Sequence, residues 1–222
     1  MKTTMKITVF LFGMLLSLFL FSCGPARVVP PPTAFAYSSP DVAVDFYTTG
    51  STGIPSDIDW AGEVGIFVLD STYKGVYIDS LTGEVSWTQD LQLGNNPIKI
   101  TAMNSEGQIS TNIVLKHSLS GIFTGGYNID TLSVTLDSIV WKQEYLADSV
   151  VKVDYNTEIG TNGIFYLIQD NGVFANYTTF NGLQKQFKGK VVYSPTVTPY
   201  IEGFWKYPDL DTKWRGYFKV NH

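Results

Sequence analysis

Residues 76–107 read VYIDSLTGEVSWTQDLQLGNNPIKITAMNSEG, and this stretch decides the fold class of the chain. Short runs of Val, Ile, Tyr, Trp and Thr are separated by turn residues, first at Thr82 and Gly83 and again at 104–107. Branched and aromatic side chains suit a pleated, half-buried surface, whereas Gly and Asn supply the backbone conformations that tight turns need. The stretch therefore predicts strands at 75–78, 84–87 and 98–103.

The same punctuation continues outward in both directions, and no long amphipathic helical window follows residue 34. In the first half we expect further strands at 42–47, 64–69 and 110–115. In the second half we expect strands at 133–136, 139–145, 150–155, 163–168, 173–179, 183–187, 190–193, 201–205 and 214–220. Asp170-Asn171-Gly172 and Asn181-Gly182 are hairpin signals between some of these strands. The sequence predicts an all-β protein.

The strand pattern lapses at residues 118–126, which read SLSGIFTGG. This lapse divides the chain into a domain at 34–118 and a C-terminal antiparallel β domain at 119–222. The strands of the second domain read as an up-and-down meander, which can close as a small barrel or pack as a second sandwich.

The first domain resembles a known family. Its pattern has an aliphatic strand, an Asp, a Thr-Gly turn, a short apolar strand and then a strand that ends in Ala-x-Asn-Ser-x-Gly. The matching residues are Val76, Ile78, Asp79, Thr82, Gly83, Val85, Ile98, Ile100, Ala102, Asn104, Ser105 and Gly107. Residues 40–118 are in this respect similar to bacterial cadherin-like and immunoglobulin-like domains, and the resemblance implies a sandwich of about seven strands. It does not imply calcium binding. The C-terminal domain resembles no family that we recognise.

The N-terminus has the features of a secretion signal. Lys2 and Lys6 precede an apolar run at 7–21, which at about 15 residues is shorter than the roughly 20 that a membrane-spanning helix needs. Ser22 then precedes Cys23, the only cysteine in the chain, and this order is similar to that of bacterial lipoprotein signals. We expect a signal peptide at 1–22, a lipidated Cys23 and a proline-rich tether at 23–33. The alternative is an ordinary signal peptide with Cys23 incidental.

This layout resembles an outer-membrane lipoprotein of the Bacteroidota type. The resemblance implies a membrane partner through the lipid anchor at Cys23. Residues 24–27 read GPAR and lack the acidic residues that mark surface export in such envelopes, so the periplasmic face and the cell surface both stay open.

The charge balance excludes some classes of partner. The chain has 15 basic and 20 acidic residues, for a formal net charge of −5, and the expected leader contains Lys2 and Lys6 but no acid. The remainder is therefore more acidic still, which argues against a nucleic-acid partner. A single cysteine allows no internal disulfide, so stability must come from packed apolar cores.

Five tripeptides resemble the O-glycosylation motif of Bacteroidota envelope proteins, in which Asp is followed by Ser or Thr and then an aliphatic or similar residue. The candidate acceptors are Ser71, Ser80, Thr131, Ser138 and Ser149. The alternative is that Asp and Ser or Thr are simply turn residues before strands.

Catalytic and metal-binding signals are weak. The only histidines are His117 and His222, and no strand-turn-helix elbow presents a nucleophile to either. Asp57, Asp59 and Glu63 could supply oxygens to a calcium ion, but their spacing is not that of a calcium loop. We therefore expect no enzyme activity, no metal and no cofactor.

The strongest binding signal is a cluster of aromatic residues near the C-terminus. The candidate ligand-binding residues are Tyr200, Phe204, Trp205, Tyr207, Trp214 and Tyr217. Alternation in the last strand places Trp214, Phe218 and Val220 on the core face and Tyr217 on the other. In the preceding strand Tyr200 and Phe204 share a face with Glu202 and Lys206. Flat aromatic faces beside polar groups bind sugar rings, although core packing and cross-strand pairing also use such residues.

These observations favour a non-catalytic envelope protein that acts as a binding or accessory module for glycan recognition or uptake. The alternative is a structural or adhesive lipoprotein with a protein partner, and a glycoside-active enzyme comes third. Glycan binding requires an exposed row of aromatics, whereas adhesion requires an exposed apolar patch or a free strand edge.

Overall fold

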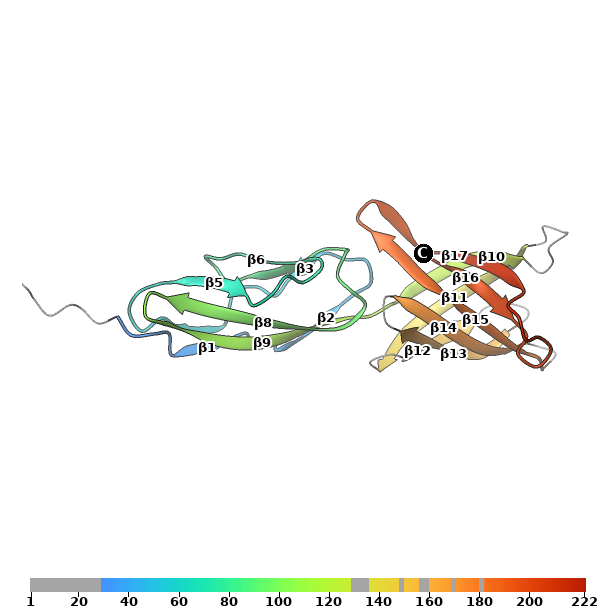
Figure 1. Cartoon of the computed structure of the whole chain (residues 1–222), viewed down its shortest axis with the longest axis horizontal. Coiled ribbons are helices and arrows are strands. Elements are labelled where there is room, and N and C mark those ends of the chain that lie inside the picture. The colour runs from blue at the N-terminus through green and yellow to red at the C-terminus, as the bar shows by residue number, and fades with distance from the viewer. Residues whose placement is uncertain (1–28, 129–135, 148–149, 156–159, 169–170, 180–181) are drawn as a thin grey trace, which may run out of the picture.

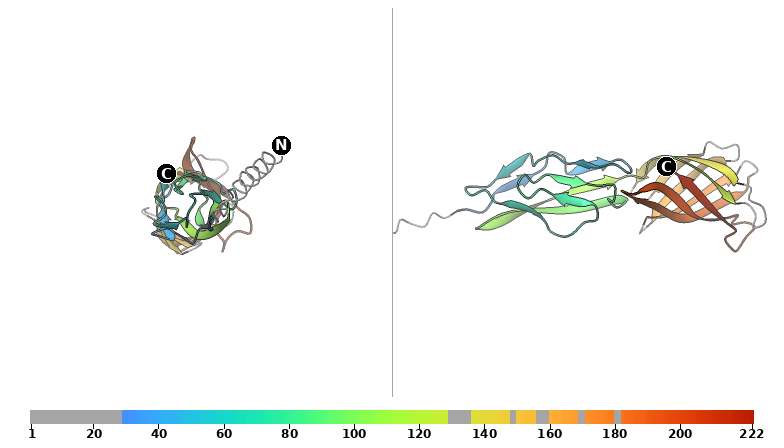
Figure 2. Two further views of the ribbon diagram at one scale, coloured as in Figure 1. Left: turned by 90° about the vertical axis from the view of Figure 1, so that its left-hand side faces the viewer. Right: turned by 90° about the horizontal axis from the view of Figure 1, so that it is seen from above.

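A computed structural model describes residues 29–128, 136–147, 150–155, 160–168, 171–179 and 182–222 of the chain (Figure 1). These residues form β-strands and no helix, so the all-β prediction is confirmed. None of the described segments is a helix long and apolar enough to cross a membrane. The strands build a sandwich and a closed barrel that lie end to end, as the views in Figure 2 also show.

The sandwich contains nine strands in three sheets. Their bounds are β1 (Ala34–Ala36), β2 (Asp41–Val44), β3 (Gly50–Ser51), β4 (Asp57–Asp59), β5 (Ile66–Leu69), β6 (Val76–Ile78), β7 (Val85–Trp87), β8 (Gly94–Asn104) and β9 (Gly107–His117). One layer has the strand order β2-β9-β8-β5 and the other β3-β7-β6, and β1 and β4 form a separate pair. The pairing of β2 with β9 is parallel and the other pairings are antiparallel.

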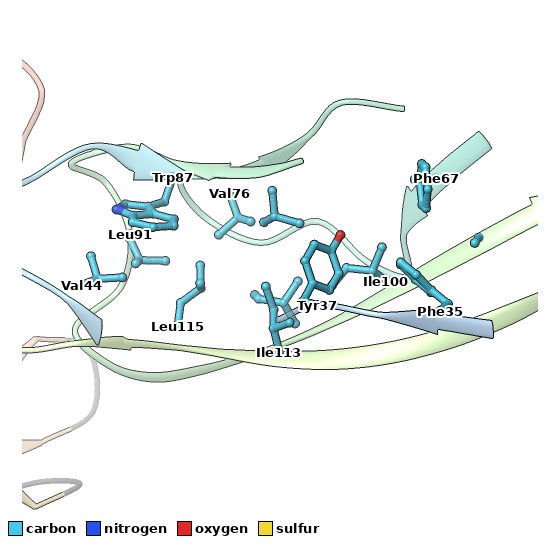
Figure 3. Close-up of a cluster of buried hydrophobic side chains, with 13 residues drawn as sticks. Phe35, Tyr37, Val44, Phe67, Val76, Trp87, Leu91, Ile100, Ile113 and Leu115 are labelled. Carbon is cyan, nitrogen blue, oxygen red and sulfur yellow. The ribbon is translucent and has the colours of Figure 1, made fainter. Parts of the chain in front are cut away.

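The core of the sandwich lies between these two layers. Figure 3 shows Trp87 and Val76 on one side, facing Leu115 and Ile113 on the other. The inward residues follow the period of two that a half-buried strand requires, as with Ile98, Ile100 and Ala102 along β8. A two-layer sandwich with seven main strands agrees with the fold that the resemblance implied.

Two turns that carried the resemblance have a clear structural role. The Asp79 carboxylate accepts hydrogen bonds from the backbone N–H groups of Leu81 and Thr82 at 2.8 and 3.1 Å, and these bonds lower its pKa. Gly83 closes this turn with a φ of 76°. The Asn104 side chain accepts from the N–H of residues 106 and 107 at 3.0 and 3.1 Å at the tip of the β8–β9 hairpin. The side chains of Asp79 and Asn104 thus accept hydrogen bonds from the backbone N–H groups of their own turns.

The barrel contains eight antiparallel strands in sequential order. Their bounds are β10 (Gly121–Asn128), β11 (Leu136–Ala147), β12 (Val150–Tyr155), β13 (Gly160–Ile168), β14 (Gly172–Thr179), β15 (Gln184–Ser194), β16 (Val197–Lys206) and β17 (Gly216–Asn221). Each strand pairs with the next, and β17 pairs with β10 to close the sheet. Of the two arrangements that the sequence left open, the barrel is therefore the one adopted.

Several expected elements are corrected by the structure. Residues 121–126, where the sequence indicated a lapse in the strand pattern, belong to β10, in which Gly125 packs closely against the backbone of β17. The expected strands 183–187 and 190–193 are one strand, β15, in which Gly189 continues the ladder. Residues 133–135 of the expected strand 133–136 lie outside the described residues, and Leu136 is the first residue of β11.

The two domains share one buried aromatic cluster. Phe46 follows β2 in the sandwich, yet its ring lies 5.9 Å from that of Phe123 and 5.5 Å from that of Tyr193, both in the barrel. The ring of His222 also reaches Phe46, at 5.3 Å, so the C-terminus returns to the junction (Figure 1). The Tyr47 hydroxyl adds hydrogen bonds of 2.9 and 3.1 Å to the carbonyls of Ser194 and Val197. The junction thus combines aromatic packing with hydrogen bonds between the two domains.

The end of the expected tether contacts the sandwich. Asn104 donates from its amide to the Pro30 carbonyl at 2.9 Å, and the Thr33 N–H donates to the Asp59 carbonyl at 2.9 Å. Pro32 is buried. Residues 30–33 are therefore docked at the end of the sandwich opposite the barrel, and any free tether ends before them. The expected signal peptide, Cys23 and the first part of the tether lie outside the described residues.

Candidate ligand-binding face

Side chains along strands β15, β16 and β17 alternate between the inside and the outside of the barrel. On β15 the inward residues include Phe187 and Val191, and on β16 they include Ile201 and Trp205, all of them buried. The residues between them point out of the barrel. We call these residues the outer face: Lys188, Lys190, Tyr200, Glu202, Phe204, Lys206, Tyr217 and Lys219.

The strand register arranges the outer face in rows. Lys188 pairs with Phe204, and Phe204 pairs with Tyr217. The next row on the same face is Lys190, Glu202 and Lys219. Cross-strand neighbours lie about 5 Å apart, so these side chains form one continuous surface.

The aromatic part of this surface is open to solvent. Phe204 is 56% exposed and Tyr217 is 44% exposed, and their ring centres lie 6.4 Å apart at an angle of 76°. Large apolar side chains with so much exposed area are unusual on a monomeric surface when they adjoin each other. The pair offers a flat ring face and an edge in the middle of a polar surround.

Charged groups contact the aromatic rings directly. The Lys219 ammonium lies 3.7 Å from the centre of the Tyr200 ring, which is a close cation–π contact. The Tyr217 hydroxyl donates a short hydrogen bond to the Glu202 carboxylate. Partial burial, and next this bond to Glu202, raise the pKa of Tyr217 to about 12, so the hydroxyl keeps its proton at neutral pH.

Trp214 extends the outer face from the loop between β16 and β17. The strand β17 begins at Gly216, so Trp214 is not on the core face of a strand as the sequence suggested; it is 38% exposed. The Lys206 ammonium lies 5.3 Å from the Trp214 ring centre. A bidentate ion pair between Arg215 and Asp211, with N–O distances of 2.6 and 2.8 Å, braces the loop.

Two of the six sequence candidates do not belong to this surface. Trp205 is fully buried, because its parity on β16 directs it into the barrel beside Phe187 and Phe218. Tyr207 packs against Trp205 with ring centres 5.4 Å apart and is only partly exposed. The structure brings together the other four, Tyr200, Phe204, Trp214 and Tyr217.

The lysines of β15 are the part of this surface that sequence reasoning missed. The run QKQFKGK at 184–190 places a lysine on both faces, since Lys185 is buried in the barrel with its ammonium 4.4 Å from the Trp205 ring centre. Lys188 and Lys190 are exposed on the outer face. The spacing of Phe187 and Val191 could have predicted this arrangement, because two large apolar residues four positions apart mark the inward face of the strand.

Both histidines contact the Phe46 ring at the junction of the two domains. His117 is buried at the end of β9, and its Nδ1 lies 3.0 Å from the Leu91 carbonyl, which can only accept a hydrogen bond. Burial lowers the pKa of His117, which is therefore neutral at pH 7. His222 packs by its ring edge against Phe46 and Phe123.

Two of the three acidic residues that could have bound calcium, Asp59 and Glu63, have other partners. Asp59 accepts hydrogen bonds from Thr33 and Ala61, and Glu63 accepts from the Ser105 hydroxyl at 2.6 Å. No group of three or more His, Cys, Asp or Glu side chains within the described part of the chain is placed to hold a metal ion.

The candidate glycosylation sites fall in different settings. Ser71 and Ser80 are exposed in turns of the sandwich. Ser138 lies on β11, opposite Gly126 on β10, and nothing is described of its side chain. Thr131, Ser149 and the candidate lipidation site Cys23 lie outside the described residues.

Comparisons of the chain with protein-family models, with curated proteins and with solved structures find no match.

Proposed function

We propose that this chain is a non-catalytic, lipid-anchored protein of the bacterial cell envelope that binds a polysaccharide through the outer face of β15–β17. One observation carries the proposal: Phe204 and Tyr217 are neighbours on adjacent strands and are both exposed, beside a carboxylate and lysines. A sugar ring stacks its C–H face on an aromatic ring and directs its hydroxyls to neighbouring polar groups.

The polar groups on this face have suitable chemistry for sugar hydroxyls. Glu202 lies between Lys190 and Lys219 in the row beside the aromatic pair, so it can accept hydrogen bonds while the lysines donate them. The face lies on the strands of a closed barrel, where hydrogen bonds on both sides fix each strand. A binding surface on rigid strands loses little conformational entropy when it takes up a ligand.

The arrangement of the two domains supports an anchored binding protein. Residues 30–33 dock at one end of the sandwich, and the barrel follows its other end. Strands β8 and β9 have 11 residues each, which corresponds to a length of roughly 36 Å. The sandwich would act as a spacer between a lipidated Cys23 and the barrel.

The test is affinity electrophoresis of the full-length chain in mild detergent, in gels that contain one member of a polysaccharide panel. The variants are Phe204→Ala and Tyr217→Ala, and the matched control is Tyr77→Ala, an equally exposed aromatic on the sandwich strand β6. We expect at least one polysaccharide to retard the wild type and the control, and the outer-face variants to migrate freely.

Retardation that persists in both outer-face variants would place binding elsewhere and contradict the proposal. Absence of retardation by every polysaccharide would also contradict it. Circular dichroism of each variant shows that the lost binding does not come from lost fold.

A second candidate, adhesion to an envelope protein, rests on a different surface. Strand β6 is an edge of the sheet β3-β7-β6, and Tyr77 and Leu81 are exposed on it and beside it. Edge strands with exposed apolar residues can pair with another chain. The variant Tyr77→Lys would abolish capture of such a partner but leave polysaccharide retardation unchanged.

A further inference from the structure

The outer face carries a charge that is opposite to that of the whole chain. It holds four lysines, Lys188, Lys190, Lys206 and Lys219, and one carboxylate, Glu202. The chain itself has a formal net charge of −5. The excess of cations on three adjacent strands is therefore a local feature and does not follow from composition.

None of these four lysines forms an ion pair with another described residue. Among the residues that the structure describes, ion pairs join Lys116 with Asp41 and Arg215 with Asp211, and none involves an outer-face lysine. Lys206 and Lys219 lie over aromatic rings, which leaves their positive charge uncompensated by a carboxylate. Glu202 is already engaged by the Tyr217 hydroxyl. Uncompensated cations on an acidic protein attract an anionic ligand to one place.

We infer that the polysaccharide bound here is anionic, with carboxylate or sulfate groups on its sugar units. This inference rests on the proposed function and specifies its ligand class. The aromatic pair stacks on a sugar ring, and the lysines on either side of it receive the acidic groups of that ring and its neighbours. In the row of Phe204, Lys188 is the lysine directly beside the stacking site.

The surface fits a polysaccharide better than a nucleic acid. A nucleic acid carries a phosphate on every nucleotide and demands a long basic track. The four outer-face lysines lie on three adjacent strands of a chain whose formal net charge is −5, which is not a long basic track. The exposed stacking site is a single aromatic pair beside a few lysines, which matches one sugar ring and the acidic groups next to it.

The experiment compares polygalacturonate with its fully methyl-esterified form, which has the same sugar backbone without the charge. Binding to the full-length chain is measured by affinity electrophoresis at low and high salt. We expect polygalacturonate to bind at least about tenfold more tightly than the ester, and the preference to shrink as salt rises.

The lysines are tested with the double variant Lys188→Gln/Lys190→Gln. The control is Lys74→Gln/Lys99→Gln, which makes the same charge change at two exposed lysines of the sandwich. We expect the outer-face variant to bind polygalacturonate about tenfold more weakly than the wild type, and the sandwich variant to bind as the wild type does.

The possible outcomes separate the two claims. Equal binding of both polymers, or binding of neutral polysaccharides alone, overturns the inference and leaves the proposed function intact. Binding that depends on the lysines but not on Phe204 and Tyr217 contradicts the proposed stacking site. Tighter binding of a single-stranded oligonucleotide than of polygalacturonate, or no binding of any polymer, overturns the inference.

Discussion

The hydroxyl of Tyr193 in the barrel donates a hydrogen bond of 2.9 Å to the carbonyl of Leu91 in the sandwich. Both residues are buried, and burial raises the pKa of Tyr193 to about 12. His117 shares the same carbonyl through its Nδ1 at 3.0 Å. One backbone oxygen thus connects the last strand of the sandwich, the loop before β8 and the barrel.

The variant Tyr193→Phe removes this donor and keeps the ring. Because Leu91 retains its bond from His117, we expect a loss of only about 1 kcal/mol in the free energy of unfolding. Urea denaturation followed by tryptophan fluorescence measures it. Tyr200→Phe, on the outer face, is the control and should change nothing; equal midpoints for the two variants would show that the bond to Leu91 contributes no stability.

The ring of Phe46 contributes more, because it is a buried side chain of the sandwich that packs among the barrel side chains. Phe46→Ala should leave a cavity at the junction and cost about 3–5 kcal/mol. It should also uncouple the domains, so that calorimetry shows separate transitions where the wild type has one. Phe35→Ala, in the sandwich core alone, is the control. A single transition in the Phe46 variant would mean that other contacts couple the domains.

Acid should weaken the fold through His117. Its Nδ1 donates to Leu91, and its buried Nε2 has no hydrogen-bond partner in the described structure, so protonation would bury an uncompensated charge. The pKa of His117 is lower in the folded chain than the ordinary value of 6.5, chiefly through burial. The unfolded chain therefore binds the proton more readily as pH falls below about 6.5, and stability decreases with it.

Denaturation midpoints at pH 7.5 and at progressively lower pH, down to about 5, test this relation. His117→Gln should flatten the loss over that range, whereas His222→Gln, which removes the other histidine, should leave it. A midpoint that falls equally in both variants would assign the acid sensitivity to carboxylates.

The sequence predicted best where local chemistry decides the structure. The turn at Asn104 and the turn that Asp79 and Gly83 form are specified by their own side chains, and both lie where the pattern indicated. The strands β1, β3 and β4 were missed because each has only two or three residues and, unlike the equally short β6 and β7, none of them flanks the Asp79–Gly83 turn.

The candidate site was harder to predict, because alternation divides a strand into two faces without saying which face is inside. On β17 the parity of Phe218 and Val220 was correctly predicted. Trp205 points into the barrel from β16, so its prediction as a surface residue was wrong. The inward position of Lys185 on β15 could not be predicted from its own strand, since the aromatic rings that contact its ammonium come from distant sequence.

Strands β15 and β16 approach each other closely at Gly203. A Cβ at this position would lie 2.1 Å from the Lys188 carbonyl oxygen and 2.4 Å from the Cα of Gly189, its cross-strand partner. These neighbours are backbone atoms, which cannot rotate away as a side chain could. Gly203→Ala should therefore push the two strands apart and cost about 3 kcal/mol or more in the free energy of unfolding.

The matched control is Gly182→Asn in the loop before β15, where φ is +82° and nothing lies within 4 Å. Asn tolerates that backbone conformation, so the control should lose less than about 1 kcal/mol. Denaturation followed by tryptophan fluorescence, to which the buried Trp205 contributes, measures the midpoint of both variants, and equal midpoints would show that the barrel can yield at Gly203.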